Sequence, residues 1–153
     1  MDIRKRISFE EIRKIDRVDY LSRFGYELCN EFFKGSSSPK DTTTYKNNAK
    51  KVAVLEGFFD FLSLVSSLGE DAQNFNFCML NSLSFLEKSR AFLEQFETIH
   101  LYFDNDPDRM KSANYLKSLN EKYKDESGLY KNYKDLNDWI LRIGKGQRKQ
   151  SLI

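Results

Sequence analysis

The feature that most constrains the fold of this chain is an alternation of short apolar segments with longer amphipathic ones, which begins at residue 51. Largely apolar segments of strand length occupy residues 51–57, 75–81 and 98–104. Segments with helical spacing of apolar residues follow them, at residues 58–69, 82–96 and 107–123. Helical connections of this length join parallel strands and cover the sheet. The sequence therefore predicts an α/β fold with a central, mostly parallel sheet of about four strands and helices on both faces.

The segments around this core carry weaker patterns. Residues 127–133 predict a fourth, weaker strand, and residues 134–144 predict a closing helix. Upstream, residues 24–33 alternate well enough for a strand, whereas residues 34–48 are rich in turn-forming, basic and hydroxyl side chains and are expected to form a linker. We divide the chain into a charged, helix-compatible segment, a short α+β segment, a core domain and a tail, at residues 1–22, 23–50, 51–143 and 144–153.

The bulk composition limits the classes of function. The 153 residues suit one domain, and a formal charge of only +2 argues neither for nor against a nucleic-acid partner. No apolar stretch is long enough to span a bilayer, and the first residues lack the apolar core of a signal peptide, so we expect a cytoplasmic protein without a membrane partner. Cys29 and Cys78 form no CxxC pair and predict neither a zinc ribbon nor a disulfide framework. His100 lies in an apolar run and is expected to be structural.

Three aspartates follow the third strand of the core at alternate positions, Asp104, Asp106 and Asp108. An EF-hand loop also begins in this way, but it needs a glycine at its sixth position and a glutamate at its twelfth, where this chain has Arg109 and Tyr115. Two interpretations stay open from these residues alone. The aspartates form either a metal site or a solvated turn in which one of them caps the following helix.

A second acidic position favours the metal site. Glu56 ends the first strand of the core, and Gly57 follows it, where a tight turn is expected. Because the carboxyl ends of parallel strands share one edge of the sheet, Glu56, Asp104 and Asp106 are expected to lie close together there. Three carboxylates repel one another unless a cation neutralises them, and such oxygen ligands suit Mg²⁺ or Mn²⁺.

Two of these motifs carry a family resemblance. The segment VAVLEGFFDFLSL has a Glu-Gly pair followed by an aspartate, Asp60, and an apolar helix, and the acidic pair Asp104 and Asp106 follows a later strand. Together they resemble the Toprim domain of bacterial primases, type IA and type II topoisomerases and some nucleases, and the first motif looks like its primase form. In the family a small residue and a glycine usually follow the acidic pair, where this chain has Asp108 and Arg109.

Flanking segments extend the resemblance over about residues 23–142. YKDLNDWI is similar to the Lys-Asp-x-Asp segment that closes the primase active site, with Asp135 as the match and Asn137 where an aspartate is usual. FGYELCNEFFKGSSSPKDTT is similar to the segment that precedes Toprim in primases and lines the nucleotide site. The chain most resembles primase-like proteins of bacterial mobile elements. Because a full primase also carries a zinc ribbon and a larger basic subdomain, a reduced catalytic core is expected.

The resemblance implies RNA primer synthesis, which is nucleotidyl transfer with Mg²⁺ or Mn²⁺ as cofactor, from nucleoside triphosphates on single-stranded DNA during replication. The metal ligands that it implies are Glu56, Asp104 and Asp106, with Asp60 and Asp135 as outer or second-metal ligands. The phosphate contacts that it implies are Lys34, Lys40 and Lys134. Glu56 is also the candidate catalytic residue for proton transfer. For each assignment a structural alternative exists, since Asp60 can cap the helix that follows it and the lysines can be solvated surface.

Two other classes of function stay open. One is a non-catalytic module that binds metal and nucleic acid and works with a partner subunit, such as a helicase or a zinc-ribbon protein, and the other is a Toprim nuclease. In each case a chain with a charge of only +2 needs a local basic strip to bind nucleic acid. We expect this strip to face the acidic site and to consist of Lys34, Lys40, Lys46, Lys50 and Lys51.

Overall fold

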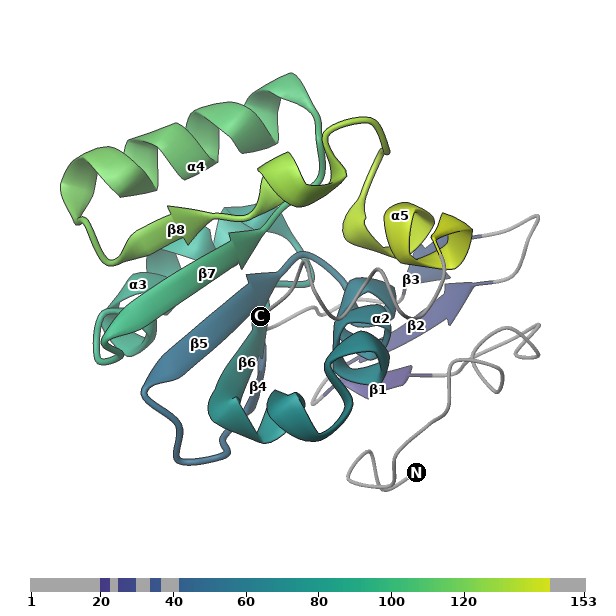
Figure 1. Ribbon diagram of the computed structural model, residues 1–153, viewed down its shortest axis with the longest axis horizontal. Helices are drawn as coiled ribbons and strands as arrows, with labels where there is room; N and C mark the ends of the chain where they lie inside the picture. The colour runs from purple at the N-terminus through teal and green to yellow at the C-terminus, as the bar shows by residue number, and fades with distance from the viewer. Residues whose placement is uncertain (1–19, 23–24, 30–33, 37–41, 144–153) are drawn as a thin grey trace.

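The computed structural model describes residues 20–22, 25–29, 34–36 and 42–143 (Figure 1). The main sheet consists of β4 (Thr43–Tyr45), β5 (Lys51–Leu55), β6 (Phe75–Met79), β7 (Thr98–Tyr102) and β8 (Tyr123–Asp125). The accompanying helices are α2 (Phe58–Leu68), α3 (Leu86–Leu93), α4 (Pro107–Leu119) and α5 (Leu136–Arg142). Short 3₁₀ turns are η1 (Gly69–Asn74), η2 (Leu83–Phe85) and η3 (Ser127–Tyr130). None of the described helices has the length and apolar character needed to cross a bilayer.

The five strands follow the order β4-β6-β5-β7-β8 across the main sheet. The strands β5, β6, β7 and β8 are parallel, and β4 runs antiparallel to β6 at the edge. Helices α2 and α5 cover one face of this sheet, while α3 and α4 cover the other. The predicted α/β fold with a mostly parallel sheet between two helical layers is therefore confirmed.

Burial on both faces explains why the central strands are largely apolar. In β5, Val52 and Val54 pack in the core beneath α3 and α4, whereas Ala53 and Leu55 pack in the core beneath α2 and α5. All four side chains are fully buried. Successive side chains of a strand point to opposite faces, so a strand that is covered on both faces favours apolar residues at every position. The buried exception is Asn76 in β6, whose side-chain amide donates to the carbonyls of Ala49 and Lys51.

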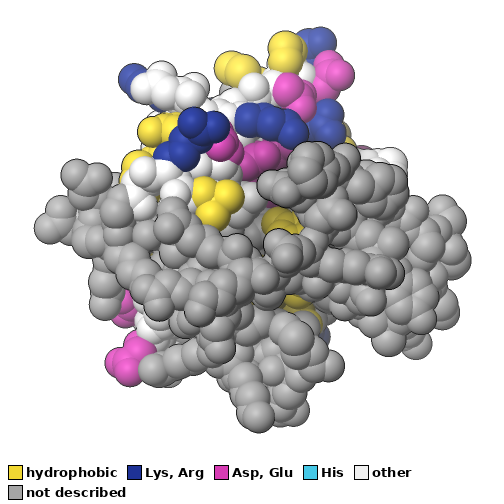
Figure 2. Space-filling model, turned by 90° about the vertical axis from the view of Figure 1, so that its right-hand side faces the viewer, with side chains coloured by type: hydrophobic (Ala, Val, Ile, Leu, Met, Phe, Trp, Pro, Cys, Tyr) yellow, Lys and Arg dark blue, Asp and Glu magenta, His cyan; other side chains and the backbone are white. Residues whose placement is uncertain are grey.

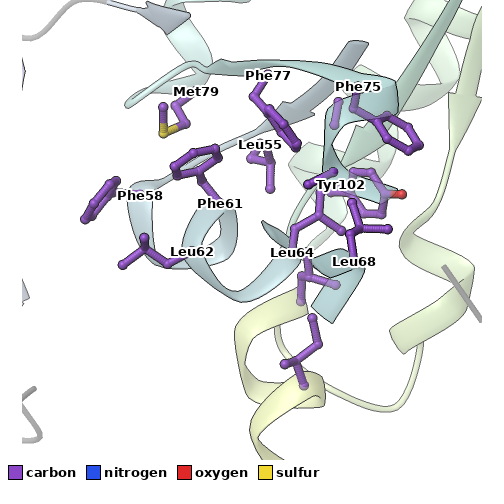
Figure 3. Packing of buried hydrophobic residues seen from close by; sticks show 14 of the residues in the cluster. Leu55, Phe58, Phe61, Leu62, Leu64, Leu68, Phe75, Phe77, Met79 and Tyr102 are labelled. Carbon is purple, nitrogen blue, oxygen red and sulfur yellow. The ribbon is translucent and has the colours of Figure 1, made fainter. Parts of the chain in front are cut away.

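The core beneath α2 is largely aromatic and aligns this helix on the sheet. The Phe61 ring stacks on Tyr45 of β4 with centroids 5.1 Å apart and meets Phe77 of β6 edge to face at 5.2 Å. Figure 3 shows Phe61 pointing from α2 toward the strand residues Leu55 and Phe77. Only two residues separate β5 from α2, so this packing also sets the position of the turn between them, which contains Glu56.

The fourth parallel strand lies at β8 and not at residues 127–133, which instead contain the turn η3. The prediction was wrong because β8 has little local signal: only Tyr123 is buried, whereas Lys124 is exposed. Pairing with β7 supplies the strand, through the Ile99 N–H that donates to the Lys122 carbonyl at 2.9 Å and through the Glu126 N–H that donates to the Leu101 carbonyl at 2.9 Å. An edge strand needs few apolar residues, since most of its surface faces water.

Upstream, β1 (Tyr20–Ser22), β2 (Gly25–Cys29) and β3 (Lys34–Ser36) form an antiparallel sheet of three strands. The strand predicted within residues 24–33 is confirmed as β2. The predicted linker at 34–48 is wrong in two places, because it contains β3 and the edge strand β4, whose threonines favour extended backbone. Pairing of β1 with β2 also crosses the boundary that we placed after residue 22. Residues 1–19, the tail 144–153 and Lys40 lie outside the described residues.

Gly69 closes α2 in a conformation that other residues adopt at a cost. Its φ is +59° and its ψ is −121°. Replacing Gly69 by alanine is expected to lower the free energy of unfolding by about 1–2 kcal/mol, because a Cβ disfavours positive φ. Gly128 in η3 is the control: it has no positive φ, and a Cβ added there meets no atom within 4 Å. Equal losses for both variants in chemical denaturation would contradict the explanation.

Candidate functional site

The candidate site lies where the connections of the sheet change direction. From β5 the chain leads through α2 to β6 on one side, and from β7 it leads through α4 to β8 on the other side. Because β5 and β7 are neighbours, a crevice is expected beyond their carboxyl ends, and ligands of open α/β sheets bind at such points. Glu56 directly follows β5, and Asp104 and Asp106 follow β7. We call these three residues the acidic edge.

The structure brings the acidic edge together, as predicted, and places an arginine within it. The Asp104 N–H donates to Oε1 of Glu56 at 3.1 Å. Arg109 lies between the other two acids, with its Nε 3.1 Å from Oε2 of Glu56 and 3.2 Å from Oδ2 of Asp106. Oε2 of Glu56 and Oδ2 of Asp106 both contact this one nitrogen, so the two carboxylates lie on either side of the same guanidinium.

Arg109 supplies a positive charge among the carboxylates of the acidic edge. We expected a cation to neutralise the crowded carboxylates, and in this structure the guanidinium does so. Burial lowers the pKa of Arg109, but the charges of Glu56, Asp106 and Asp104 outweigh it and raise this pKa above its usual value. Arg109 therefore stays charged at every physiological pH.

Asp106 also has the structural role that the alternative interpretation assigned to it. Its Oδ1 accepts hydrogen bonds from the N–H groups of Asp108 and Arg109, at 3.0 and 3.1 Å, and so caps α4. Pro107 occupies the first helical position, where its missing N–H costs nothing. Asp108 is exposed and pairs with Lys111 at 3.4 Å. One oxygen of Asp106 is thus used by the helix, and the other faces Arg109.

Asn105, which looked like a spacer in the sequence, connects the acidic edge to the loop before α5. Its side-chain amide donates to the carbonyls of Tyr130 and Tyr133, at 2.7 and 3.0 Å, and its N–H donates to the Lys134 carbonyl at 2.8 Å. This loop consequently places Lys134 beside the end of β7, with Asp135 next to it in the chain. Only its position between two aspartates could have drawn attention to Asn105.

Tyr130 is a second residue that sequence reasoning missed. Its ring is buried, and its hydroxyl donates to the Phe103 carbonyl at 2.8 Å. Burial raises the pKa of Tyr130 above its usual value, and the negative charges of Asp60 and Asp104 raise it further. The hydroxyl is therefore a permanent donor that lies within electrostatic reach of both acids and holds β7 and η3 together.

Asp60, on the first turn of α2, faces the first turn of α5. It is 8% exposed, and its Oδ1 accepts the Asn137 N–H at 3.0 Å. The Asn137 side chain in turn accepts the Ser63 hydroxyl at 2.6 Å, so α2 and α5 are connected at two points. The N-cap residue of α2 is Gly57, which has no side chain with which to cap the helix.

The expectation that Gly57 provides a tight turn is not supported by its backbone. Its φ of −138° and ψ of 170° are extended values that any residue can adopt. A Cβ added to Gly57 would lie 3.9 Å from Oδ2 of Asp60. This is an ordinary van der Waals distance, so a Cβ at this position would fit without displacing Asp60.

Asp135 caps α5, and its Oδ1 accepts the Asp138 N–H at 2.7 Å. The proposed ligands Asp60 and Asp135 therefore each contribute one oxygen to the same short helix. In the described part of the chain, no group of three or more His, Cys, Asp or Glu side chains is arranged closely enough to hold a metal ion. Carboxylate oxygens nevertheless suit a hard cation, so the acidic edge fits Mg²⁺ chemically once Arg109 moves.

Three of the five lysines of the predicted basic strip, Lys46, Lys50 and Lys51, lie away from the acidic edge. Lys50 and Lys51 lie at the start of β5, at the opposite end of the sheet, where Lys50 pairs with Glu97 at 2.9 Å and Lys51 lies 5.5 Å from the Phe75 ring centroid. Lys46 lies 5.4 Å from the Phe92 ring centroid. The prediction was wrong for these three because closeness in sequence to β5 is not closeness to its carboxyl end. For Lys34 only the backbone is described.

Figure 2 views the molecule from the right-hand side of Figure 1. On the described part of this surface, Lys or Arg side chains adjoin Asp or Glu side chains.

Comparisons with known proteins bear on this arrangement. A family model described as Toprim-like matches residues 53–140, which is more than half of the chain. No curated protein matches significantly. Among solved structures, the chain is similar to the primase fragment of the bacteriophage T7 primase-helicase protein, with a TM-score of 0.59 and 18% identity. The match covers 89% of this chain and 60% of the T7 fragment, and at this identity it shows a shared fold.

Proposed function

This chain belongs to the Toprim-like family, and on that premise we propose that it is a primase-type nucleotidyltransferase whose acidic edge binds Mg²⁺ or Mn²⁺. The observation that carries the proposal is the approach of Glu56 to Asp106 across the point where the sheet connections diverge, with Arg109 between them. Two carboxylates from neighbouring strand ends, already paired with a cation, form the kind of site that a divalent cation and a triphosphate require.

In this proposal Glu56, Asp104 and Asp106 are the primary ligands, and Asp60 and Asp135 hold outer positions through their remaining oxygens. A bound divalent cation supplies neutralisation of the triphosphate and alignment of the attacking 3′ oxygen. In this proposal Glu56, whose side chain is 13% exposed, also takes a proton from the attacking hydroxyl.

Phosphate contacts and partners complete the proposal. Lys134, brought to the end of β7 by Asn105, is the described candidate for a phosphate contact, and the resemblance adds Lys34 and Lys40. Substrates are nucleoside triphosphates on a single-stranded DNA template. The T7 protein is a primase-helicase, so we propose a helicase as a partner of this chain, or a zinc-ribbon protein. Residues 23–50 would be the segment that precedes Toprim, and residues 51–143 the Toprim domain itself.

Addition of Mg²⁺ or Mn²⁺ is expected to raise the melting temperature of the protein, because a ligand that binds only the folded state stabilises it. At a metal concentration one hundred times Kd the gain is about 2.7 kcal/mol. The double variant Asp104→Asn/Asp106→Asn is expected to lose this gain. Its metal-free stability should fall slightly, since Asp106 loses its ion pair with Arg109 while asparagine still caps α4.

Asp108→Asn is the matched control, because Asp108 is exposed and pairs with Lys111 outside the acidic edge. It should keep the full metal response in thermal denaturation. If the double variant responds to metal as strongly as the unaltered protein, the cation binds elsewhere.

A second candidate is a non-catalytic module that binds metal and nucleic acid, and the position of Arg109 among the proposed ligands favours it. Incubation of the chain with single-stranded DNA, ribonucleoside triphosphates and Mn²⁺ separates the two. Synthesis of oligoribonucleotides that is lost in Glu56→Gln supports the primase. Binding of DNA without synthesis, also when a helicase is added, supports the module, and cleavage of the DNA supports a nuclease.

A further inference from the structure

We propose that Arg109 is a built-in counter-ion that a divalent cation must displace from the acidic edge, so that Arg109 sets the affinity of this chain for the metal. The inference rests on the proposed metal function and adds a residue that controls it. Arg109 stands at a position where the family usually has a small residue or glycine, so the device belongs to this chain.

The guanidinium and a metal ion need the same two oxygens. Nε of Arg109 lies 3.1 Å from Oε2 of Glu56 and 3.2 Å from Oδ2 of Asp106. A Mg²⁺ ion binds carboxylate oxygens at about 2.0–2.1 Å, so an ion shared by these two oxygens would lie in the space that the guanidinium fills.

The other oxygens of the two acids are already engaged. Oε1 of Glu56 accepts the Asp104 N–H at 3.1 Å and also lies 3.3 Å from Nε of Arg109. Oδ1 of Asp106 accepts two backbone N–H groups of the first turn of α4. A metal can therefore be shared by Glu56 and Asp106 without breaking the helix cap only if it takes the oxygens that Arg109 holds.

Arg109 can leave by rotation but not by losing its proton. Its guanidinium remains charged beside three carboxylates, so a divalent cation at the same place would meet strong repulsion. The side chain is 32% exposed, whereas that of Glu56 is 13% exposed, so the arginine has a path to water while the glutamate stays in place. In the exchange a divalent cation would replace the single positive charge of Arg109 with two positive charges beside the carboxylates.

The first test measures metal affinity in Arg109→Gln, with Mn²⁺ as the probe in calorimetry and thermal denaturation. In this variant Mn²⁺ no longer competes with the guanidinium of Arg109 for the carboxylate oxygens. We therefore expect Mn²⁺ to bind at least about tenfold more tightly. The metal-free variant should melt at a lower temperature, because Glu56 and Asp106 then repel each other. Arg90→Gln is the matched control, since Arg90 also joins two acids, Glu87 and Glu94, and its side chain is 29% exposed.

The second test uses the unaltered protein and does not depend on the variant folding. The Nε–H signal of Arg109 is followed by ¹H–¹⁵N NMR during titration with Mg²⁺, with Arg109→Lys used for its assignment. Displacement predicts that this signal moves to the position of a free side chain and loses its protection from exchange. The Nε–H of Arg90, which is 3.2 Å from Glu94, should not change.

The outcomes separate this inference from the proposed function. The inference is supported if Mn²⁺ binds Arg109→Gln more tightly than the unaltered protein and the Nε–H signal of Arg109 shifts on addition of Mg²⁺. It is also supported if Arg109→Gln binds Mn²⁺ and the unaltered protein does not. Equal affinity in both proteins, or an unchanged Arg109 signal at saturating metal, overturns it and leaves the proposed metal function intact. A purely structural arginine gives that result. Absence of metal binding in every protein overturns both.

Discussion

Replacing Phe61 by alanine is expected to lower the free energy of unfolding by about 3–5 kcal/mol. The side chain is 4% exposed, and the centroid of its ring lies 5.1 Å from that of Tyr45 and 5.2 Å from that of Phe77. The alanine leaves a cavity between α2 and the strands β4 and β6, which the rigid sheet cannot close. Because a domain of this size is stable by only about 5–15 kcal/mol, the variant should melt far below the unaltered protein.

Phe92→Ala is the control for this prediction. Phe92 contacts Phe96 at 5.2 Å but is only partly buried on α3, so its loss should cost less than half as much. Chemical denaturation followed by the fluorescence of Trp139, which is buried in the same core as Phe61, measures both variants. Similar losses for Phe61→Ala and Phe92→Ala would show that the aromatic core beneath α2 is not the main source of stability.

The second large effect is expected for Asn105→Ala, which should lower the free energy of unfolding by about 2–3 kcal/mol. The variant loses two hydrogen bonds, to the carbonyls of Tyr130 and Tyr133, and leaves both acceptors without this donor in a partly buried position. The loop that carries Lys134 and Asp135 then keeps two of its hydrogen bonds to the end of β7, from the Asn105 N–H and from the Tyr130 hydroxyl. The melting temperature and its rise with Mg²⁺ should therefore both decrease.

Asn120→Ala serves as the comparison, because the Asn120 side chain accepts a single hydrogen bond, from the Lys122 N–H at 3.0 Å, at the other end of α4. It should cost about 1 kcal/mol and leave the metal response unchanged. A loss for Asn105→Ala no greater than that for Asn120→Ala would mean that the loop before α5 is positioned by its own packing.

Local physical chemistry was sufficient to predict the elements of the core. A strand buried on both faces is largely apolar along its length, and this made β5, β6 and β7 recognisable without any knowledge of their neighbours. Some helix ends were equally local, since Gly69 ends α2 and Asp106 caps α4, whereas α3 begins at Leu86, four residues later than predicted. From parallel strands followed by acids, the meeting of Glu56 with Asp106 could be inferred as well.

Tertiary structure alone decided the features that depend on residues distant in the chain. The edge strand β8 exists because β7 offers it hydrogen bonds, and Asp60 reaches Asn137, 77 residues away, because α2 and α5 share one face of the sheet. Lysines near β5 in sequence lie at the wrong end of the sheet for the acidic edge. The counter-ion Arg109 was visible in the sequence only as an unusual residue after an acidic pair. Its partner Glu56 is 53 residues away in the chain, so the two side chains come into contact only in the folded protein.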